Sequence, residues 1–219
     1  MRSENVQKFK TINQLIETGV IGVVRAETSK QGMEIAKACL AGGIDTIELT
    51  FTVPNADQVI GKLTEQFGSE MVIGAGTVLD SATARIAILA GASFIVSPGF
   101  SLETAKLCNR YQVPYIAGCM TITEMTTAME AGVDIIKLFP SPVFGPEFIE
   151  LIKGPLPHAN IMPTGGINLD NIDQWIKSGC LLVGASSDLT APAKTGDYAG
   201  VTALAKKFVT KVKEARAEL

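Results

Sequence analysis

The residue of this chain best suited to chemistry is Lys137, the one charge in the apolar run "IIKLF" of residues 135–139. An ammonium in such a run loses much of its hydration, so the side chain must either reach solvent or serve a purpose inside the protein. A second candidate is Glu48, in the run "TIELTF". Because side chains alternate along a strand, Glu48 shares a face with two threonines and is expected to point inward, away from the covering helices.

If Lys137 and Glu48 meet, they form a site for chemistry on a ketone. Desolvation favours a neutral amine, which can attack the carbonyl carbon and form an iminium that accepts electrons when a neighbouring carbon–carbon bond breaks. A buried carboxylate beside it can carry the protons. The direction of Lys137 stays open, because both faces of its run are otherwise apolar. The alternative is a structural ion pair, but burying such a pair brings no clear gain in stability, so a function explains it better.

Three runs of small residues end predicted strands and leave room for a ligand. "GAGT", residues 74–77, ends the third strand and adds the hydroxyl of Thr77, while "PTGG", residues 163–166, and "GASS", residues 184–187, end the seventh and eighth. Loops at the last two strands of a barrel often bind phosphate through backbone N–H groups. We therefore expect a phosphate site there. The alternative is that the glycines only relieve crowding between strands.

Arg25 ends the first predicted strand, at the rim where barrel enzymes build their sites. Its guanidinium is suited to hold a carboxylate through two parallel hydrogen bonds. An ion pair with a surface carboxylate such as Glu27 is the alternative, and the sequence does not decide between the two.

Eight short β-type runs, separated by segments of helix length, must position these residues. The runs begin at Val20, Thr46, Val72, Phe94, Tyr115, Ile135, Ile161 and Leu181. This alternation predicts parallel strands with right-handed crossovers, an α/β fold of the (β/α)8 TIM-barrel type. An amphipathic pattern from Val6 to Ile16 predicts an additional N-terminal helix, and residues 1–219 are expected to form one domain. A doubly wound open sheet is the alternative, but no glycine-rich turn follows the first strand.

A short motif recurs before the even-numbered strands. It reads "AGGIDTIELT", "AGASFIVSPG", "AGVDIIKLFP" and "SGCLLVGASS". In each copy a small residue and a glycine end a helix, and the strand follows at once. The glycine is expected to take the left-handed conformation that closes a helix, so the repeating unit is a pair of βα modules.

Composition argues against several classes of function. Lys+Arg 19 against Asp+Glu 22 gives a net charge of -3 without a basic block, so no nucleic-acid partner is expected. The charged start does not resemble a signal peptide, and no apolar run reaches the roughly 20 residues of a membrane helix. Cys39, Cys108, Cys119 and Cys180 lie far apart, which indicates buried, reduced thiols of a cytoplasmic protein. The single histidine, His158, lies in a proline-rich run typical of a surface loop, which argues against a Ser-His-Asp triad and excludes a multi-histidine metal site.

The segments around Lys137 and Glu48 resemble signatures of the family of 2-keto-3-deoxy-6-phosphogluconate (KDPG) and 4-hydroxy-2-oxoglutarate (KHG) aldolases. "GVDIIKLFPSPVFG" is similar to the family's Schiff-base signature, and "GIDTIELTF" is similar to its second signature. "GAGTV", "SPG", "PTGG" and the loop after the last strand follow in the family's order, so the likeness covers nearly the whole chain. It implies a class I lyase with a TIM-barrel fold, commonly a homotrimer, that works without a metal or an organic cofactor.

The resemblance also implies a role for each site residue. Lys137 would form the imine with the 2-keto carbon, and Glu48 would handle the protons. The pyruvate end of the substrate would be lined by Thr77, Pro98 and Phe139. The phosphate would be held by Thr164, Gly165, Gly166, Gly184 and Ser186. The implied partners are small molecules, a 2-keto sugar-acid phosphate and pyruvate.

One position departs from the family pattern. Many members carry an arginine for the substrate carboxylate after "ELTF", where this chain has Thr52, so Arg25 on the neighbouring strand is expected to replace it. KDPG cleavage is the leading hypothesis, with KHG as a second substrate. The 2-keto-3-deoxy-6-phosphogalactonate aldolases are the nearest alternative, because the two sugar acids differ only in a hydroxyl configuration. A phosphosugar isomerase and a non-catalytic sensor of sugar-acid phosphates are more distant alternatives.

Overall fold

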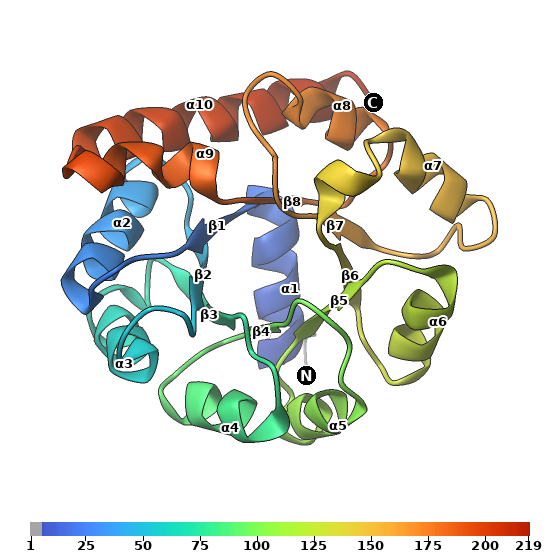
Figure 1. Ribbon diagram of the computed structural model, residues 1–219, viewed down its shortest axis with the longest axis horizontal. Helices are drawn as coiled ribbons and strands as arrows, with labels where there is room; N and C mark the ends of the chain where they lie inside the picture. Colours follow the sequence, from blue (N-terminus) through green and yellow to red (C-terminus); the bar gives the residue numbers. More distant parts are fainter. Residues whose placement is uncertain (1–5) are drawn as a thin grey trace.

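The computed structural model describes residues 6–219 and shows a ring of parallel strands enclosed by helices (Figure 1). The strands are β1 (Val20–Val24), β2 (Thr46–Thr50), β3 (Val72–Gly76), β4 (Ile95–Val96), β5 (Tyr115–Cys119), β6 (Ile135–Leu138), β7 (Ile161–Pro163) and β8 (Val183–Ala185). Consecutive strands pair from β1 to β7, and β8 pairs with β1. A parallel bridge between Thr164 and Gly184 joins the last gap, so the barrel is nearly closed. The predicted (β/α)8 barrel is confirmed.

Helices fill the connections between the strands. They are α1 (Gln7–Thr18), α2 (Ser29–Ala41), α3 (Ala56–Phe67), α4 (Ser81–Leu89), α5 (Leu102–Tyr111), α6 (Ile122–Glu130), α7 (Glu147–Lys153), α8 (Ile172–Lys177), α9 (Ser187–Thr190) and α10 (Tyr198–Ala217), with the 3-10 turns η2 (Ser141–Val143) and η3 (Ala191–Thr195). Several begin where the sequence supplies a cap. The side chains of Thr28, Asp80 and Ser101 accept backbone N–H groups of the first turn that follows them. Thr121 and Glu124 form a reciprocal capping box at α6.

The strands begin at the predicted residues except at β4 and β8. β4 starts at Ile95 instead of Phe94, and β8 starts at Val183 instead of Leu181. Leu181 N–H still donates to the Ile161 carbonyl at 2.9 Å, so the difference lies only in where regular pairing begins. The glycine of each repeated motif has the predicted left-handed backbone, with φ 89, 104, 83 and 91° at Gly43, Gly91, Gly132 and Gly179.

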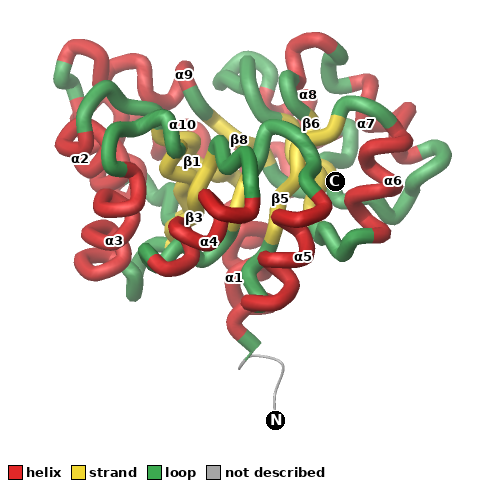
Figure 2. Tube along the Cα trace, turned by 60° about the horizontal axis from the view of Figure 1, so that its bottom comes forward, coloured by secondary structure: helices red, strands yellow, loops and turns green. Residues whose placement is uncertain are grey.

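Two apolar cores build the barrel. The larger lies between the strands and the surrounding helices. The smaller fills the barrel itself and is made of Leu15, Ile21, Phe94, Val96, Ile116, Ile135, Met162 and Leu182. Leu15 comes from α1, the predicted N-terminal helix, which closes the end of the barrel where the strands begin (Figures 1 and 2). This leaves the opposite end, where the strands finish, open for a site.

Other predictions from composition agree with the structure. The four cysteines are buried and free, and His158 is exposed in a turn. Within residues 6–219, no helix has the length and apolar character needed to cross a membrane.

Candidate active site

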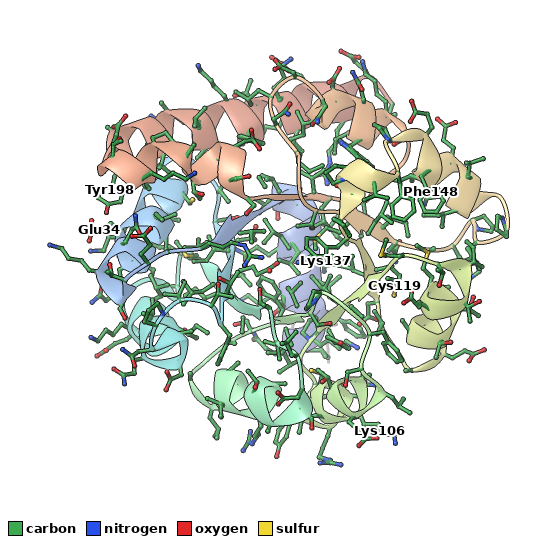
Figure 3. All side chains as sticks on the ribbon, viewed as in Figure 1. Glu34, Lys106, Cys119, Lys137, Phe148 and Tyr198 are labelled. Atoms are coloured by element: carbon green, nitrogen blue, oxygen red, sulfur yellow. The ribbon has the colours of Figure 1, made fainter. Side chains whose placement is uncertain are left out.

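Lys137 and Glu48 meet inside the barrel. In β6, Ile135 belongs to the interior core, while Ile136 and Leu138 belong to the outer core, so Lys137 between them points inward. Its Nζ lies 3.4 Å from Glu48 Oε1, and the two side chains are 4% and 0% exposed. Figure 3 shows Lys137 near the centre of the ring of strands, whereas Glu34 and Lys106 lie at the periphery. The structure therefore settles the direction that the sequence pattern left open.

Glycines in the neighbouring strands make room for this pair. A Cβ at Gly76, at the end of β3, would collide with the Glu48 side chain. A Cβ at Gly118, which lies beside Lys137 in the sheet register, would collide with the Pro98 carbonyl. The absence of a side chain at both positions lets Glu48 and the loop after β4 come close to the barrel axis.

Two buried polar atoms in the same space have no partner among residues 6–219. They are Glu48 Oε2 and Thr164 Oγ1. Buried polar atoms are nearly always hydrogen-bonded, so unpaired ones in a candidate site point to contacts with a ligand. Thr164 follows β7, and its side chain lies where a Cβ at Gly184 would have to go. Both atoms are therefore available for hydrogen bonds with a ligand.

Of the residues expected at the pyruvate end, Phe139 has a direct contact with Lys137. The Phe139 ring centroid lies 5.2 Å from Lys137 Nζ, a distance at which an aromatic face attracts a cation. Pro98 is half-buried after β4. Thr77 follows β3 with φ 57°, a left-handed conformation that is unfavourable for a β-branched residue. Strain of this kind is concentrated at functional sites, where surrounding structure holds it in place.

Side chains fix the loop expected to hold phosphate. Gly165 and Gly166 have left-handed φ values of 91° and 63°. Ser141 Oγ donates to the Gly165 carbonyl at 2.6 Å, and Asn171 Nδ2 donates to the Gly166 carbonyl at 2.8 Å. Both loop carbonyls are therefore occupied by hydrogen bonds from side chains. The peptide N–H groups of such a left-handed loop are suited to bind an anion.

Arg25 lies next to the position where the family arginine is replaced. Its Nη1 is 3.5 Å from Thr52 Oγ1, and Thr52 Oγ1 is in turn 2.7 Å from Thr50 Oγ1. No ion pair of Arg25 occurs within the described part of the chain, so its pairing with Glu27 is not seen. The guanidinium is exposed and available to an anion.

A cavity of about 460 Å³ opens at the rim beside β1, β2 and β8 and is lined in part by Arg25, Thr52, Ser186 and Lys194. It brings Arg25, expected to bind a carboxylate, to the same space as Ser186, expected to bind phosphate. Lys137 and Glu48 are not part of its wall and lie deeper in the barrel. A larger cavity of about 600 Å³ lies along α1, where the Asp45 carboxylate already accepts hydrogen bonds from Gln14 and Thr18. The rim cavity fits the expected chemistry; the larger one is at the closed end.

Tyr115 is a supporting residue that sequence reasoning missed. Its hydroxyl accepts from the Ser101 N–H at 3.2 Å and lies 2.6 Å from Ser97 Oγ, which donates to the Gly99 carbonyl at 2.5 Å. Burial raises the pKa of Tyr115, so it stays a donor. This chain of hydrogen bonds holds the turn that carries Pro98. Nothing in the sequence distinguished it, because a tyrosine at the start of a strand is ordinary.

Gln31 is a second residue without a sequence signal. Its Oε1 accepts from the Glu27 N–H at 2.9 Å, and its Nε2 donates to the Ala193 carbonyl at 3.1 Å. It thereby ties the loop after β1 to η3 across a sequence separation of 162. Residues 6–219 contain no cluster of three or more His, Cys, Asp or Glu side chains suited to hold a metal ion.

Comparisons with known proteins match this chain to one family of aldolases. A family model described as "KDPG and KHG aldolase" matches residues 11–204. The 2-dehydro-3-deoxy-6-phosphogalactonate aldolase of Escherichia coli is 33% identical over 171 residues, which cover 78% of this chain and 83% of the relative. The 2-dehydro-3-deoxy-phosphogluconate aldolase of Pseudomonas aeruginosa is 32% identical over 214 residues, which cover 96% of this chain and 97% of the relative.

Solved structures extend the likeness to three dimensions. A structure titled "Native KDPGal structure" superposes with a TM-score of 0.85 at 31% identity, covering 91% of this chain and 96% of that one. The KDPG aldolase from Legionella pneumophila, with pyruvate captured as a covalent carbinolamine, superposes with a TM-score of 0.80 at 29% identity, covering 86% of this chain and 92% of that one. Sequence identity and structural superposition therefore relate this chain to the same aldolases.

Proposed function

Because this chain belongs to the KDPG and KHG aldolase family, we propose that it cleaves KDPG to pyruvate and glyceraldehyde 3-phosphate through a Schiff base on Lys137. Membership makes the protein a carbon–carbon lyase. The observation that carries the proposal is the buried Lys137 with its Nζ 3.4 Å from Glu48 Oε1. An amine and a carboxylate held together in a dry interior are the groups that imine chemistry requires.

In the first stage, Lys137 becomes bonded to the substrate. The neutral amine attacks the C2 ketone and forms a carbinolamine. Glu48, in its protonated form, gives a proton to the C2 hydroxyl, which leaves as water, and an iminium remains. Thr77, Pro98 and Phe139 are proposed to enclose this end of the substrate. Glu48 is left as a carboxylate.

In the second stage, the carbon chain breaks between C3 and C4. The Glu48 carboxylate takes the proton of the C4 hydroxyl, the aldehyde forms, and the electron pair of the broken bond moves into the iminium to give an enamine. C3 of the enamine then regains a proton from Glu48. Water attacks the resulting iminium, the proton set free in this hydrolysis returns to the Glu48 carboxylate, and pyruvate leaves with the Lys137 amine restored. The same steps convert KHG to pyruvate and glyoxylate, the second proposed activity.

The ends of the substrate carry its charges. We assign the carboxylate to Arg25, in place of the arginine replaced by Thr52. We assign the phosphate to a set of residues after β7 and β8. That set consists of Thr164, Gly165, Gly166, Gly184 and Ser186. The rim cavity, which Arg25 and Ser186 both line, supports this division.

A galactonate substrate is the second candidate. Both the Escherichia coli 2-dehydro-3-deoxy-6-phosphogalactonate aldolase and the structure titled "Native KDPGal structure" support it, at 33% and 31% identity. Pyruvate release from KDPG and from its galactonate isomer, measured as kcat/KM, distinguishes the two. We expect the larger value for KDPG. A larger value for the galactonate isomer would make it the preferred substrate in place of KDPG. Release of pyruvate from neither compound would overturn the aldolase assignment.

We propose that residues 1–219 act as one barrel domain and that the protein is a cytoplasmic homotrimer. A related chain, 31% identical with a TM-score of 0.85, forms part of a cage designed from symmetric oligomeric domains. Large exposed apolar side chains on and beside α4 and α5, including Leu79, Leu89 and Leu102, offer surface for such contacts. Light scattering of the purified protein tests the trimer. The free cysteines fit a reducing compartment.

A further inference from the structure

The rim cavity carries more positive charge than the site described so far requires. Its wall includes the cations Arg25 and Lys194 and the single carboxylate Glu27. Neither cation takes part in an ion pair with another described residue. Two unpaired cations facing one concave space concentrate positive potential there, and this favours an anionic ligand.

Hydroxyl groups lie on the same wall as Lys194. Ser186 and Ser187 follow β8, Thr190 ends α9, and Lys194 lies in η3, so one continuous segment contributes all four to the cavity. Hydroxyls and an ammonium are donors that suit the three oxygens of a phosphate group. A second wall, with Arg25 and Thr52, comes from the loops after β1 and β2.

The backbone beside Lys194 is fixed by Gln31. Ala193 is buried, with 3% of its surface exposed. Its carbonyl accepts from Gln31 Nε2 at 3.1 Å, while Gln31 Oε1 holds the Glu27 N–H at 2.9 Å. The two walls of the cavity are therefore tied together one residue away from Lys194. A lysine side chain on a fixed backbone can bind a ligand in the cavity with a smaller loss of conformational entropy.

The position of Lys137 decides on which side of the cavity each end of the substrate lies. The C2 carbon must reach Lys137 Nζ, which is buried in the barrel and outside the cavity wall. The carboxylate on the neighbouring carbon is assigned to Arg25, on the β1 side of the cavity. The phosphate is at the far end of the chain and extends toward the rim, where Ser186 and Lys194 lie.

We propose that Lys194 is a specificity-determining residue, whose ammonium binds the phosphate of the substrate from the η3 side of the rim cavity. The inference rests on the proposed aldolase function and adds a contact to it. Lys194 favours phosphorylated sugar acids over their unphosphorylated counterparts, because only the former place a dianion at the rim. It has no part in the bond-breaking steps.

The test compares two substrates that differ only in the phosphate, KDPG and 2-keto-3-deoxygluconate. For Lys194→Ala we expect KM for KDPG to rise roughly two- to fivefold, the loss of one solvent-exposed charge contact. We expect kcat for KDPG and kcat/KM for 2-keto-3-deoxygluconate to stay unchanged. Lys194→Arg should recover most of the affinity. Lys213→Ala, which removes an exposed lysine of α10, is the matched control and should change neither substrate.

Two further measurements support the comparison. The advantage of the wild type over Lys194→Ala should shrink at about 1 M salt, where the Debye length is about 3 Å. Gln31→Met, which keeps the bulk but loses both hydrogen bonds, should raise KM for KDPG in the same direction. An unchanged KM in Lys194→Ala, or an equal loss on both substrates, would overturn the proposal.

Failure of the aldolase function is distinguishable from failure of this inference. If the wild type cleaves neither substrate, the aldolase assignment fails. Calorimetric titration with glycerol 3-phosphate then tests Lys194 alone. Weaker binding to Lys194→Ala than to the wild type and to Lys213→Ala supports the contact, and equal or absent binding to all three refutes it.

Discussion

Lys137 Nζ lies 3.4 Å from Glu48 Oε1, although the two residues are 89 positions apart in the sequence. The contact exists because β2 and β6 both direct alternate side chains into the barrel and because glycines in the adjacent strands leave the space open. Glu48 Oε2 remains without a protein partner among the described residues. One carboxylate oxygen therefore faces the lysine while the other is available to a substrate.

Glu48→Gln should preserve the fold and remove most of the turnover. The amide has nearly the same shape but cannot exchange protons, and a positioned general acid–base group contributes roughly 10²- to 10⁴-fold to a rate. Steady-state release of pyruvate measures the loss, and circular dichroism verifies the fold. Turnover close to that of the wild type would show that Glu48 does not carry out the proton transfers.

Arg25→Ala should raise KM for the 2-keto acid, by roughly tenfold, since a charge-assisted contact to the carboxylate is lost. kcat should change less, because the reacting groups are untouched. Arg110→Ala removes an exposed arginine of α5 and serves as the control. An unchanged KM would mean that Arg25 does not replace the family arginine missing at Thr52.

Tyr115→Phe should lower the free energy of unfolding by about 1 kcal/mol, the typical net value of a buried hydrogen bond. The substitution leaves the Ser101 N–H without its acceptor and removes the contact of the Tyr115 hydroxyl with Ser97 Oγ. Urea denaturation measures the difference. Tyr111→Phe is the control, because Tyr111 is exposed. Equal stability of the two variants would contradict the importance of the Tyr115 contacts.

The cysteines should be inert in the folded protein. Burial raises the pKa of Cys39, Cys108, Cys119 and Cys180 to about 12. At about pH 8 only about one thiol in 10⁴ is then the reactive thiolate. A thiol-specific chromogenic reagent should label the folded protein very slowly and the urea-unfolded protein completely. Rapid labelling of the native protein would show an accessible, reactive thiol.

The capping box of α6 should make stability depend on pH. Hydrogen bonds lower the pKa of Glu124. The largest effect comes from the backbone N–H of Met120, and the next from the hydroxyl of Thr121. A carboxyl with a lowered pKa in the folded state stabilises above its unfolded pKa, and this contribution is lost as pH falls through the folded value. The stability difference between the wild type and Glu124→Gln should therefore be present at neutral pH and vanish in acid. A difference independent of pH would contradict this.

The barrel could be predicted because its signals are local. The alternation of apolar runs and the glycines that end helices indicated the strands, and the period-two pattern around Glu48 indicated its direction. Lys137 was different. Both faces of β6 are buried, and apart from Lys137 its residues are apolar, so the pattern does not show which face is the inner one. Only the assembled sheet shows where Lys137 points.

The contacts that complete the rim lay beyond the reach of sequence patterns. Gln31 meets Ala193 across a separation of 162, through one side chain on a helix that is otherwise unremarkable in sequence. Tyr115 fits a strand pattern through its ring, so its hydroxyl gave no separate signal. Such contacts depend on how whole elements pack, which no local pattern contains.

The central claim is that Lys137 is the nucleophile, and borohydride reduction in the presence of pyruvate tests it most directly. Mass spectrometry of the intact chain and of its peptides should find a single pyruvate adduct, confined to the peptide that contains Lys137, and none in Lys137→Met. No adduct on protein shown to be folded, or an adduct on another lysine, would contradict the Schiff-base mechanism and leave Lys137 as a buried partner of Glu48.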